Sequence, residues 1–182
     1  MKIISNKKDA IKELKRISAR TNSENNNKIN AIVGKILQDV QNYGDIAVEK
    51  YTKKFDGFNP DPMQVSENDL KAAWDEIDSN LKRSLEVALK RIKRFHEKEI
   101  PSSFTIEGEL GDTVQRKWRP VKKAGIYIPG GRAAYPSTVL MNAIPATVAG
   151  VGEIIMVSPG NKEGKINKTV LAAAHLSGIN KV

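Results

Sequence analysis

The sequence predicts an α/β fold in which a helical N-terminal half leads into an incomplete parallel sheet. Three observations support this. Apolar residues recur at helical spacing from residue 9 to residue 99. Segments with β-branched, alternating residues begin only after Pro101. From Ala124 onwards the pattern runs strand, helix, strand, helix, strand, which is typical of parallel strands joined by crossover helices.

The first helices are predicted from apolar stripes. Residues 9–20 form a short amphipathic helix, and the polar residues 22–27 form a loop. The apolar residues between 29 and 40 share one stripe, so a core-facing helix is expected there, ending near Gly44. Asp45 then caps a further helix through Tyr51.

Two more helices follow a break at residues 55–60, where aromatic anchors occur together with Gly and Pro. Ser66 precedes Asp69 by three residues, a spacing typical of a capping box, and opens a helix that continues to Ile77. The next helix, residues 80–99, has a long apolar stripe opposite a basic face.

The second half alternates strands and helices. Residues 104–106 and 113–121 are expected to pair as a hairpin. Residues 124–128 form a short buried strand, and Ser137 caps a helix through residue 148 that Pro145 should bend.

A second parallel strand covers residues 153–157, a helix covers residues 167–176 and ends at Gly178, and residues 179–182 open a third strand. So few strands bury little apolar surface. We therefore expect the chain to be part of a longer protein, or to have its sheet completed by a partner.

The composition excludes several classes of protein. The chain has 182 residues, 40% hydrophobic and 28% charged, which is typical of a soluble globular domain. It has neither a secretory signal nor an apolar run long enough to cross a bilayer, so no membrane association is expected and a cytoplasmic location follows. With 0 Cys and 2 His, it has no disulfide and no thiolate metal site.

The net charge of +9 raises the question of a nucleic-acid partner. The basic residues occur as scattered pairs interleaved with Glu and Asp, and no stacking platform or recognition motif accompanies them. A solvated surface is the preferred interpretation, and no nucleic-acid partner is expected.

A ligand site is expected where residues 124–128 end, at Tyr127-Ile128-Pro129-Gly130-Gly131. Open α/β sheets bind ligands at the carboxyl ends of their strands. The glycines allow a ligand to approach the backbone, the next helix favours an anion, and Tyr127 can stack on a flat ring. The alternative is that Pro-Gly-Gly is simply a tight turn, and the usual Gly-x-Gly-x-x-Gly fingerprint is absent.

Other candidate side chains are better explained by structure. His96 begins a His-Glu-x-x sequence, but Ile100 stands where a zinc helix has its second His, so a packed or capping role is favoured. His175 lies among alanines and is also interpreted as structural. Trp74 and Trp118 are expected in the core.

The second half closely resembles the histidinol dehydrogenase family, and the resemblance extends over nearly the whole chain. It is carried by Gly125-Ile126-Tyr127-Ile128-Pro129-Gly130-Gly131, by Ala133-Ala134-Tyr135-Pro136-Ser137-Thr138-Val139-Leu140-Met141 and by Ile144-Pro145-Ala146. Upstream, Tyr43-Gly44-Asp45, Phe55-Asp56-Gly57 and Phe95-His96-Glu97 add to it. Arg132 and Gly160 depart from the common pattern of the family.

The resemblance implies an N-terminal part of a homodimeric enzyme with a Rossmann-like NAD-binding domain. That enzyme oxidises histidinol to histidine through an aldehyde, with NAD as the oxidant and zinc holding the substrate. It implies that Tyr127 contacts NAD. The family's zinc ligands and its Glu-His pair belong to its later half, so no catalytic or metal residue is assigned here, and this chain alone is expected to be inactive.

By the same resemblance the chain divides into a helical arm (residues 1–22), a region of helices and a hairpin (residues 23–123) and an incomplete nucleotide-binding domain (residues 124–182). Two alternatives to the enzyme remain open. One is a non-catalytic interaction module derived from it, and the other is a basic nucleic-acid-binding protein.

Overall fold

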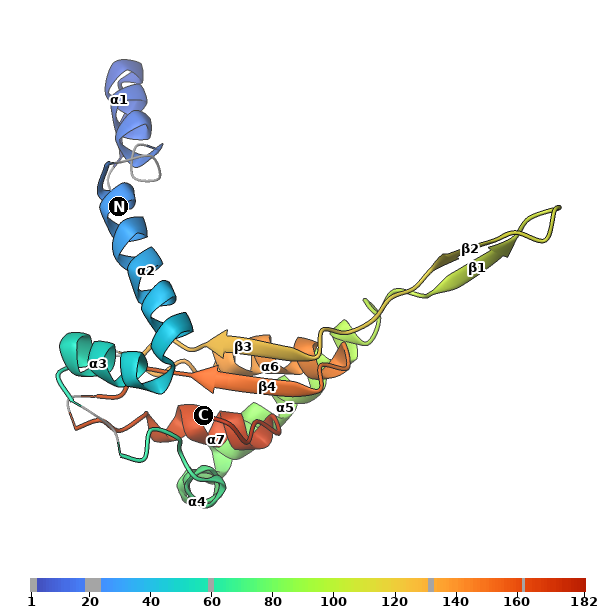
Figure 1. The fold of residues 1–182 in the computed structure, drawn as a ribbon. Coiled ribbons are helices and arrows are strands. Elements are labelled where there is room, and N and C mark those ends of the chain that lie inside the picture. The colour runs from blue at the N-terminus through green and yellow to red at the C-terminus, as the bar shows by residue number, and fades with distance from the viewer. Residues whose placement is uncertain (1–2, 19–23, 59–60, 131–132, 162) are drawn as a thin grey trace. The chain divides into compact units, whose positions relative to one another are not determined.

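The structure is a computed structural model that describes residues 3–18, 24–58, 61–130, 133–161 and 163–182 (Figure 1). The α/β class, with a helical first half and a small parallel sheet in the second, is as predicted. Contacts group the chain into two units, residues 1–55 and 56–182. Each unit is described by itself below.

The first unit consists of α1 (Lys7–Ser18), α2 (Glu24–Tyr43) and α3 (Asp45–Asp56), whose last residue crosses the boundary between the units. Gly44 separates α2 from α3 with a φ of 57°, a backbone conformation that glycine adopts without steric cost. The hydroxyl of Tyr51 on α3 donates to the Asp39 carboxylate on α2 at 2.6 Å. This bond raises the pKa of Tyr51, because the carboxylate favours the protonated phenol.

Helix α2 differs from its prediction in two ways. It begins at Glu24, so residues 24–27 are helical and not loop, while residues 22 and 23 lie outside the described part. Its apolar stripe was expected to face a core, and in the structure the larger part of it is exposed: Ile29 55%, Ile32 54%, Val33 46% and Leu37 66%. Periodicity reveals an apolar face, but not whether anything covers it.

The second unit opens with two capped helices, α4 (Glu67–Glu76) and α5 (Ser79–His96). The Ser66 hydroxyl oxygen accepts from the backbone N–H of Asp69 at 3.1 Å and donates to the Asp69 carboxylate at 2.6 Å. Asp78 accepts from the backbone N–H groups of Asn80 and Leu81. These side chains satisfy donors at the helix N-termini, which explains why both helices begin where they do.

The predicted hairpin is present as β1 (Phe104–Glu107) and β2 (Thr113–Arg116), paired antiparallel. Ile106 lies opposite Val114 and Phe104 opposite Arg116, so the apolar side chains share one face. All residues of both strands are exposed. Trp118, just beyond β2, was expected in the core and is instead 48% exposed. The Arg116 guanidinium lies 4.6 Å from its ring centroid, a cation–π contact that the apolar pattern did not indicate.

The sheet consists of β3 (Lys123–Tyr127) and β4 (Glu153–Val157), paired parallel with Tyr127 opposite Val157. Lys181 forms an isolated parallel bridge to Ile155, which is the start of the predicted third strand. Helix α6 (Pro136–Val148) connects β3 to β4, and α7 (Lys168–Leu176) follows β4. Ser137 was expected to cap α6, but the N-cap is Tyr135, because Pro136 occupies the first helical position, where its fixed φ suits the helix.

The core lies on one face of this sheet. Ile126, Ile128 and Met156 pack with buried residues of α6 and α7, and Leu70 of α4 joins the same cluster. A second cluster joins Leu140 and Ile144 of α6 to Leu85 of α5, and Trp74 packs against it as predicted. The described part of this unit therefore has the sheet, then α6 and α7, then α4 and α5.

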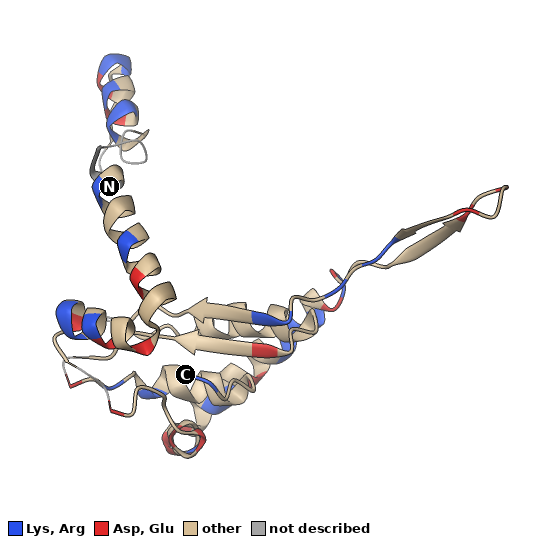
Figure 2. Cartoon of the chain, viewed as in Figure 1, with Lys and Arg blue, Asp and Glu red and all other residues tan. Residues whose placement is uncertain are grey.

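The surface carries both signs of charge. Figure 2 shows Lys and Arg on helices that also carry Asp and Glu. None of the helices in the described part is long and apolar enough to cross a membrane.

Candidate functional site

Tyr127 lies at the carboxyl end of β3, as its last residue. Its neighbours Ile126 and Ile128 point into the core and are buried, whereas Tyr127 is 63% exposed. Side chains alternate between the two faces of a strand, so Tyr127 belongs to the sheet face opposite α6 and α7, as do the exposed Ile155 and Val157 of β4. The ring is thus accessible at a strand end.

A pocket of about 320 Å³ opens at the same edge of the sheet. The connection from β3 to α6 lines one side with Pro129 and Gly130. The connection from β4 to α7, residues 158–167, lines another side with residues that include Pro159, Asn161 and Lys165. The crevice predicted at the carboxyl ends of the strands is therefore present beside the Tyr127 turn, although Tyr127 itself is not among the lining residues described. Gly131 lies outside the described residues.

Gly130 brings the two connections into contact. A Cβ at this position would stand 2.7 Å from Cγ and 2.8 Å from the carbonyl oxygen of Pro159. Real Cβ atoms do not approach other heavy atoms so closely. The tight approach of Pro159 gives this glycine a packing role.

Asn161 organises the β4–α7 connection from within. Its side-chain oxygen accepts from the backbone N–H groups of Glu163 and Lys165, both at 2.9 Å. The backbone of Asn161 also donates to the Lys165 carbonyl at 2.8 Å. The Asn161 side chain thus holds the turn closed together with these backbone bonds, so this wall of the pocket is an ordered loop.

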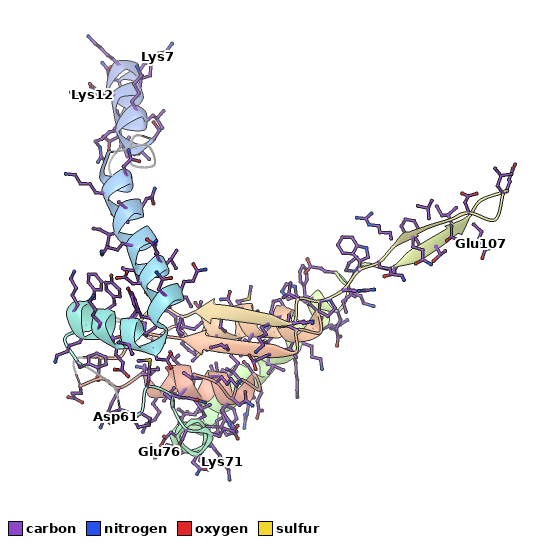
Figure 3. The ribbon with its side chains drawn as sticks, viewed as in Figure 1. Lys7, Lys12, Asp61, Lys71, Glu76 and Glu107 are labelled. Atoms are coloured by element: carbon purple, nitrogen blue, oxygen red, sulfur yellow. The ribbon has the colours of Figure 1, made fainter. Side chains whose placement is uncertain are left out.

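Two lysines contribute positive charge to the pocket, Lys165 and Lys168. Lys168 also pairs with the Glu76 carboxylate of α4 at 2.5 Å, and Figure 3 labels Glu76 on that helix. Asn167 caps α7 by accepting from the backbone N–H and the hydroxyl of Thr169. The lysines and the start of α7 suit an anionic group in the pocket, and the exposed Tyr127 ring, at the end of β3, is available to a flat ring.

The two histidines lie apart from this pocket. His96 ends α5, and its Nδ1 lies 2.5 Å from the Glu99 carboxylate. The ring therefore bonds a residue three positions along the chain, and the C-cap residue of α5 is Glu97. His175 is half-buried near the end of α7. Among the described residues, no three His, Asp or Glu side chains come together to hold a metal ion.

Sequence reasoning found the strand-end turn but not the wall opposite it. Pro159, Asn161 and Lys165 were not singled out, because their importance depends on β4 lying beside β3. The available signal was the cluster of Pro, Gly and Asn after a predicted parallel strand, which marks a loop at the ligand-binding edge of a sheet.

Comparison with known proteins gives a consistent result. A model of the histidinol dehydrogenase family matches residues 19–182. Over the whole chain, the sequence is 86% identical to histidinol dehydrogenase of Prochlorococcus marinus strain MIT 9312 and 43% identical to that of Gloeobacter violaceus. The chain covers 41% of the length of each of these two relatives.

The fold agrees with a solved structure of the same kind of protein. The crystal structure of histidinol dehydrogenase from Elizabethkingia anophelis superimposes with a TM-score of 0.76 at 36% sequence identity. The match covers 84% of this chain and 35% of the solved chain. The similarity therefore extends over most of the described fold and over about a third of the solved chain.

Proposed function

Since the chain belongs to the histidinol dehydrogenase family, we propose that it is the NAD-holding N-terminal part of an enzyme that oxidises histidinol to histidine. In this reaction the alcohol becomes an aldehyde, which then takes up water and becomes an acid. Each of the two oxidations transfers a hydride to one NAD and releases a proton. Two observations support the NAD-holding role: the accessible Tyr127 ring at the carboxyl end of β3, and a pocket at the same end of the parallel strands that begins at Pro129.

In this proposal each part of the site has a task. Tyr127 stacks on a flat ring of the dinucleotide, since its ring is exposed at the strand end. Lys165, from the opposite loop, provides positive charge toward the phosphates, and Lys168, at the start of α7, lines the same pocket while it pairs with Glu76. NAD supplies the hydride acceptor, and the residues of this chain bind and orient it.

Zinc and the acid–base residues are proposed to belong to the part of the family's length that this chain does not cover. The described residues bring no set of metal ligands together, and the chain spans about 41% of its curated relatives. A homodimer, a cytoplasmic location and the three-part division at residues 22 and 123 are further parts of the same proposal.

Replacement of Tyr127 by Ala in a full-length family member that carries this N-terminal sequence tests the cofactor role. Loss of a stacking ring should cost about 1–2 kcal/mol, which raises KM for NAD roughly tenfold. Tyr127→Phe keeps the ring and should behave like the unchanged protein. Tyr43→Ala is a matched control, because Tyr43 is also exposed, at 64%, and ends α2. An unchanged KM for NAD in Tyr127→Ala would contradict the role.

The absence of catalytic residues from this chain is tested by turnover. The 182-residue chain, mixed with histidinol, NAD and zinc, should produce no NADH above the rate without enzyme, measured by absorbance. Robust zinc-dependent NADH formation would show that this chain contains the catalytic groups, and would contradict this part of the proposal.

A further inference from the structure

We propose that Phe58 is a positioning residue for the nucleotide pocket: it backs the β4–α7 loop and so sets the distance between the two walls, without lining the pocket itself. The inference rests on the NAD-holding role proposed above. It is supported by the close contacts at three glycines, Gly164, Gly160 and Gly130.

The first contact joins Phe58 to the loop. Ring atoms Cδ2 and Cε2 of Phe58 lie 3.1 and 3.3 Å from the place where a Cβ of residue 164 would stand. Gly164 has a φ of 77°, in the left-handed region that other residues rarely adopt. The half-buried ring of Phe58 thus packs against a turn that only glycine forms without strain.

The second contact lies inside the loop. A Cβ on Gly160 would stand 2.7 Å from the carbonyl carbon of Gly164 and 2.8 Å from its oxygen. The two arms of the loop therefore touch backbone to backbone. The N–H of Gly164 also donates to the Asn161 carbonyl at 2.9 Å, which closes the turn between the arms.

The third contact reaches the opposite wall. Pro159, next to Gly160, packs against Gly130 at the distances given above. Phe58, Gly164, Gly160, Pro159 and Gly130 thus form a continuous series of close contacts from outside the pocket to the turn after Tyr127. Close-packed atoms transmit displacement, because there is no space to absorb it.

The lining residues respond to the position of this loop. Asn161 and Lys165 belong to it, so any shift of the loop moves the lysine relative to Gly130. The hydrogen bonds of Asn161 shape the loop internally, whereas Phe58 contacts it from a distant segment, just after α3. Removal of the Phe58 ring should therefore let the whole loop shift relative to Gly130. Because Asn161 and Lys165 would move with it, the affinity for the ligand should fall.

The test uses the whole 182-residue chain labelled with ¹⁵N and compares Phe58→Ala with Phe104→Ala. Phe104 is a matched control, since it lies on the exposed hairpin and loses the same atoms. In Phe58→Ala the amide resonances of Gly164, Gly160 and Gly130 should all shift, and NAD affinity should fall about tenfold. Phe104→Ala should leave these resonances and the affinity unchanged, and Phe58→Tyr should restore both.

If Phe58→Ala does not fold, Phe58→Leu replaces it, because leucine keeps an apolar contact but lacks the ring atoms that reach Gly164. A Gly130 resonance that does not respond to Phe58→Leu would overturn the inference, whatever the affinity for NAD. Weaker NAD binding in Tyr127→Ala together with unchanged binding in a folded Phe58 variant would also overturn it, while leaving the proposed function intact. NAD binding that is indifferent to Tyr127→Ala counts against the proposed function, and the response of Gly130 still decides the inference.

Discussion

Gly130 and Gly125 both lie near the candidate site, but the structure gives them different requirements. The Cβ position of Gly130 is occupied by Pro159, while that of Gly125, on β3, has nothing within 4 Å. The sequence offered two explanations for Gly130, a ligand close to the backbone or a tight turn. Contact with a distant proline was not among them, because it depends on the neighbouring strand.

This difference makes a prediction for alanine substitutions. Gly130→Ala forces a methyl group against the backbone and ring of Pro159 and should lower the free energy of unfolding by about 1–3 kcal/mol. Gly125→Ala has open space and should change it by less, or stabilise the chain by about 0.5 kcal/mol through the unfolded state. Urea denaturation of both variants checks this, and equal losses would contradict it.

At the scale of elements, an ion-pair cluster ties three chain segments at the amino ends of the parallel strands. The Glu153 carboxylate, at the start of β4, lies 2.8 Å from Lys181 Nζ and 3.0 Å from Lys123 Nζ. Hydrogen bonds from Lys181 and then Lys123 lower the pKa of Glu153. The periodicity predicted all three segments, but the ion pairs between them became apparent only when the strands were paired.

The lowered pKa of Glu153 determines how the stability of the fold depends on pH. The stabilisation by the ionised Glu153 is fully present above the usual glutamate pKa of 4.5, and it is lost as the pH falls from there through the pKa of the folded state. Glu153→Gln should therefore be less stable than the unchanged chain at neutral pH and should approach it in acid, measured by urea denaturation. Glu107→Gln, on the hairpin (Figure 3), is the control and should show no such convergence. A difference that stays constant with pH would contradict the assignment.

At the scale of the whole molecule, α6 lies between the sheet and the outer helices. The side chains that face these two layers are buried, whereas those on its remaining side are exposed. Leu140 is 0% exposed and packs in the second core cluster, while the adjacent Met141 is 55% exposed. Leu140→Ala should lower the free energy of unfolding by about 2–5 kcal/mol, because it leaves a cavity in a close-packed core. Met141→Ala should change it by less than about 0.5 kcal/mol. Thermal or urea unfolding checks both, and a similar cost for the two would mean that α6 is not buried between the layers.

The sequence by itself determined the α/β class, the order of the helices and strands, the helix cap at Ser66, and the place of Tyr127 at a strand end. These features depend on periodicity and on hydrogen bonds between near neighbours, which are local properties of the chain. Only the tertiary structure decided that Trp118 and the apolar stripe of α2 are exposed, that Pro159 packs against Gly130, and that Asn161 and Lys165 line the pocket. Such contacts join residues distant in sequence, and a local pattern specifies that a face is apolar without specifying what packs against it.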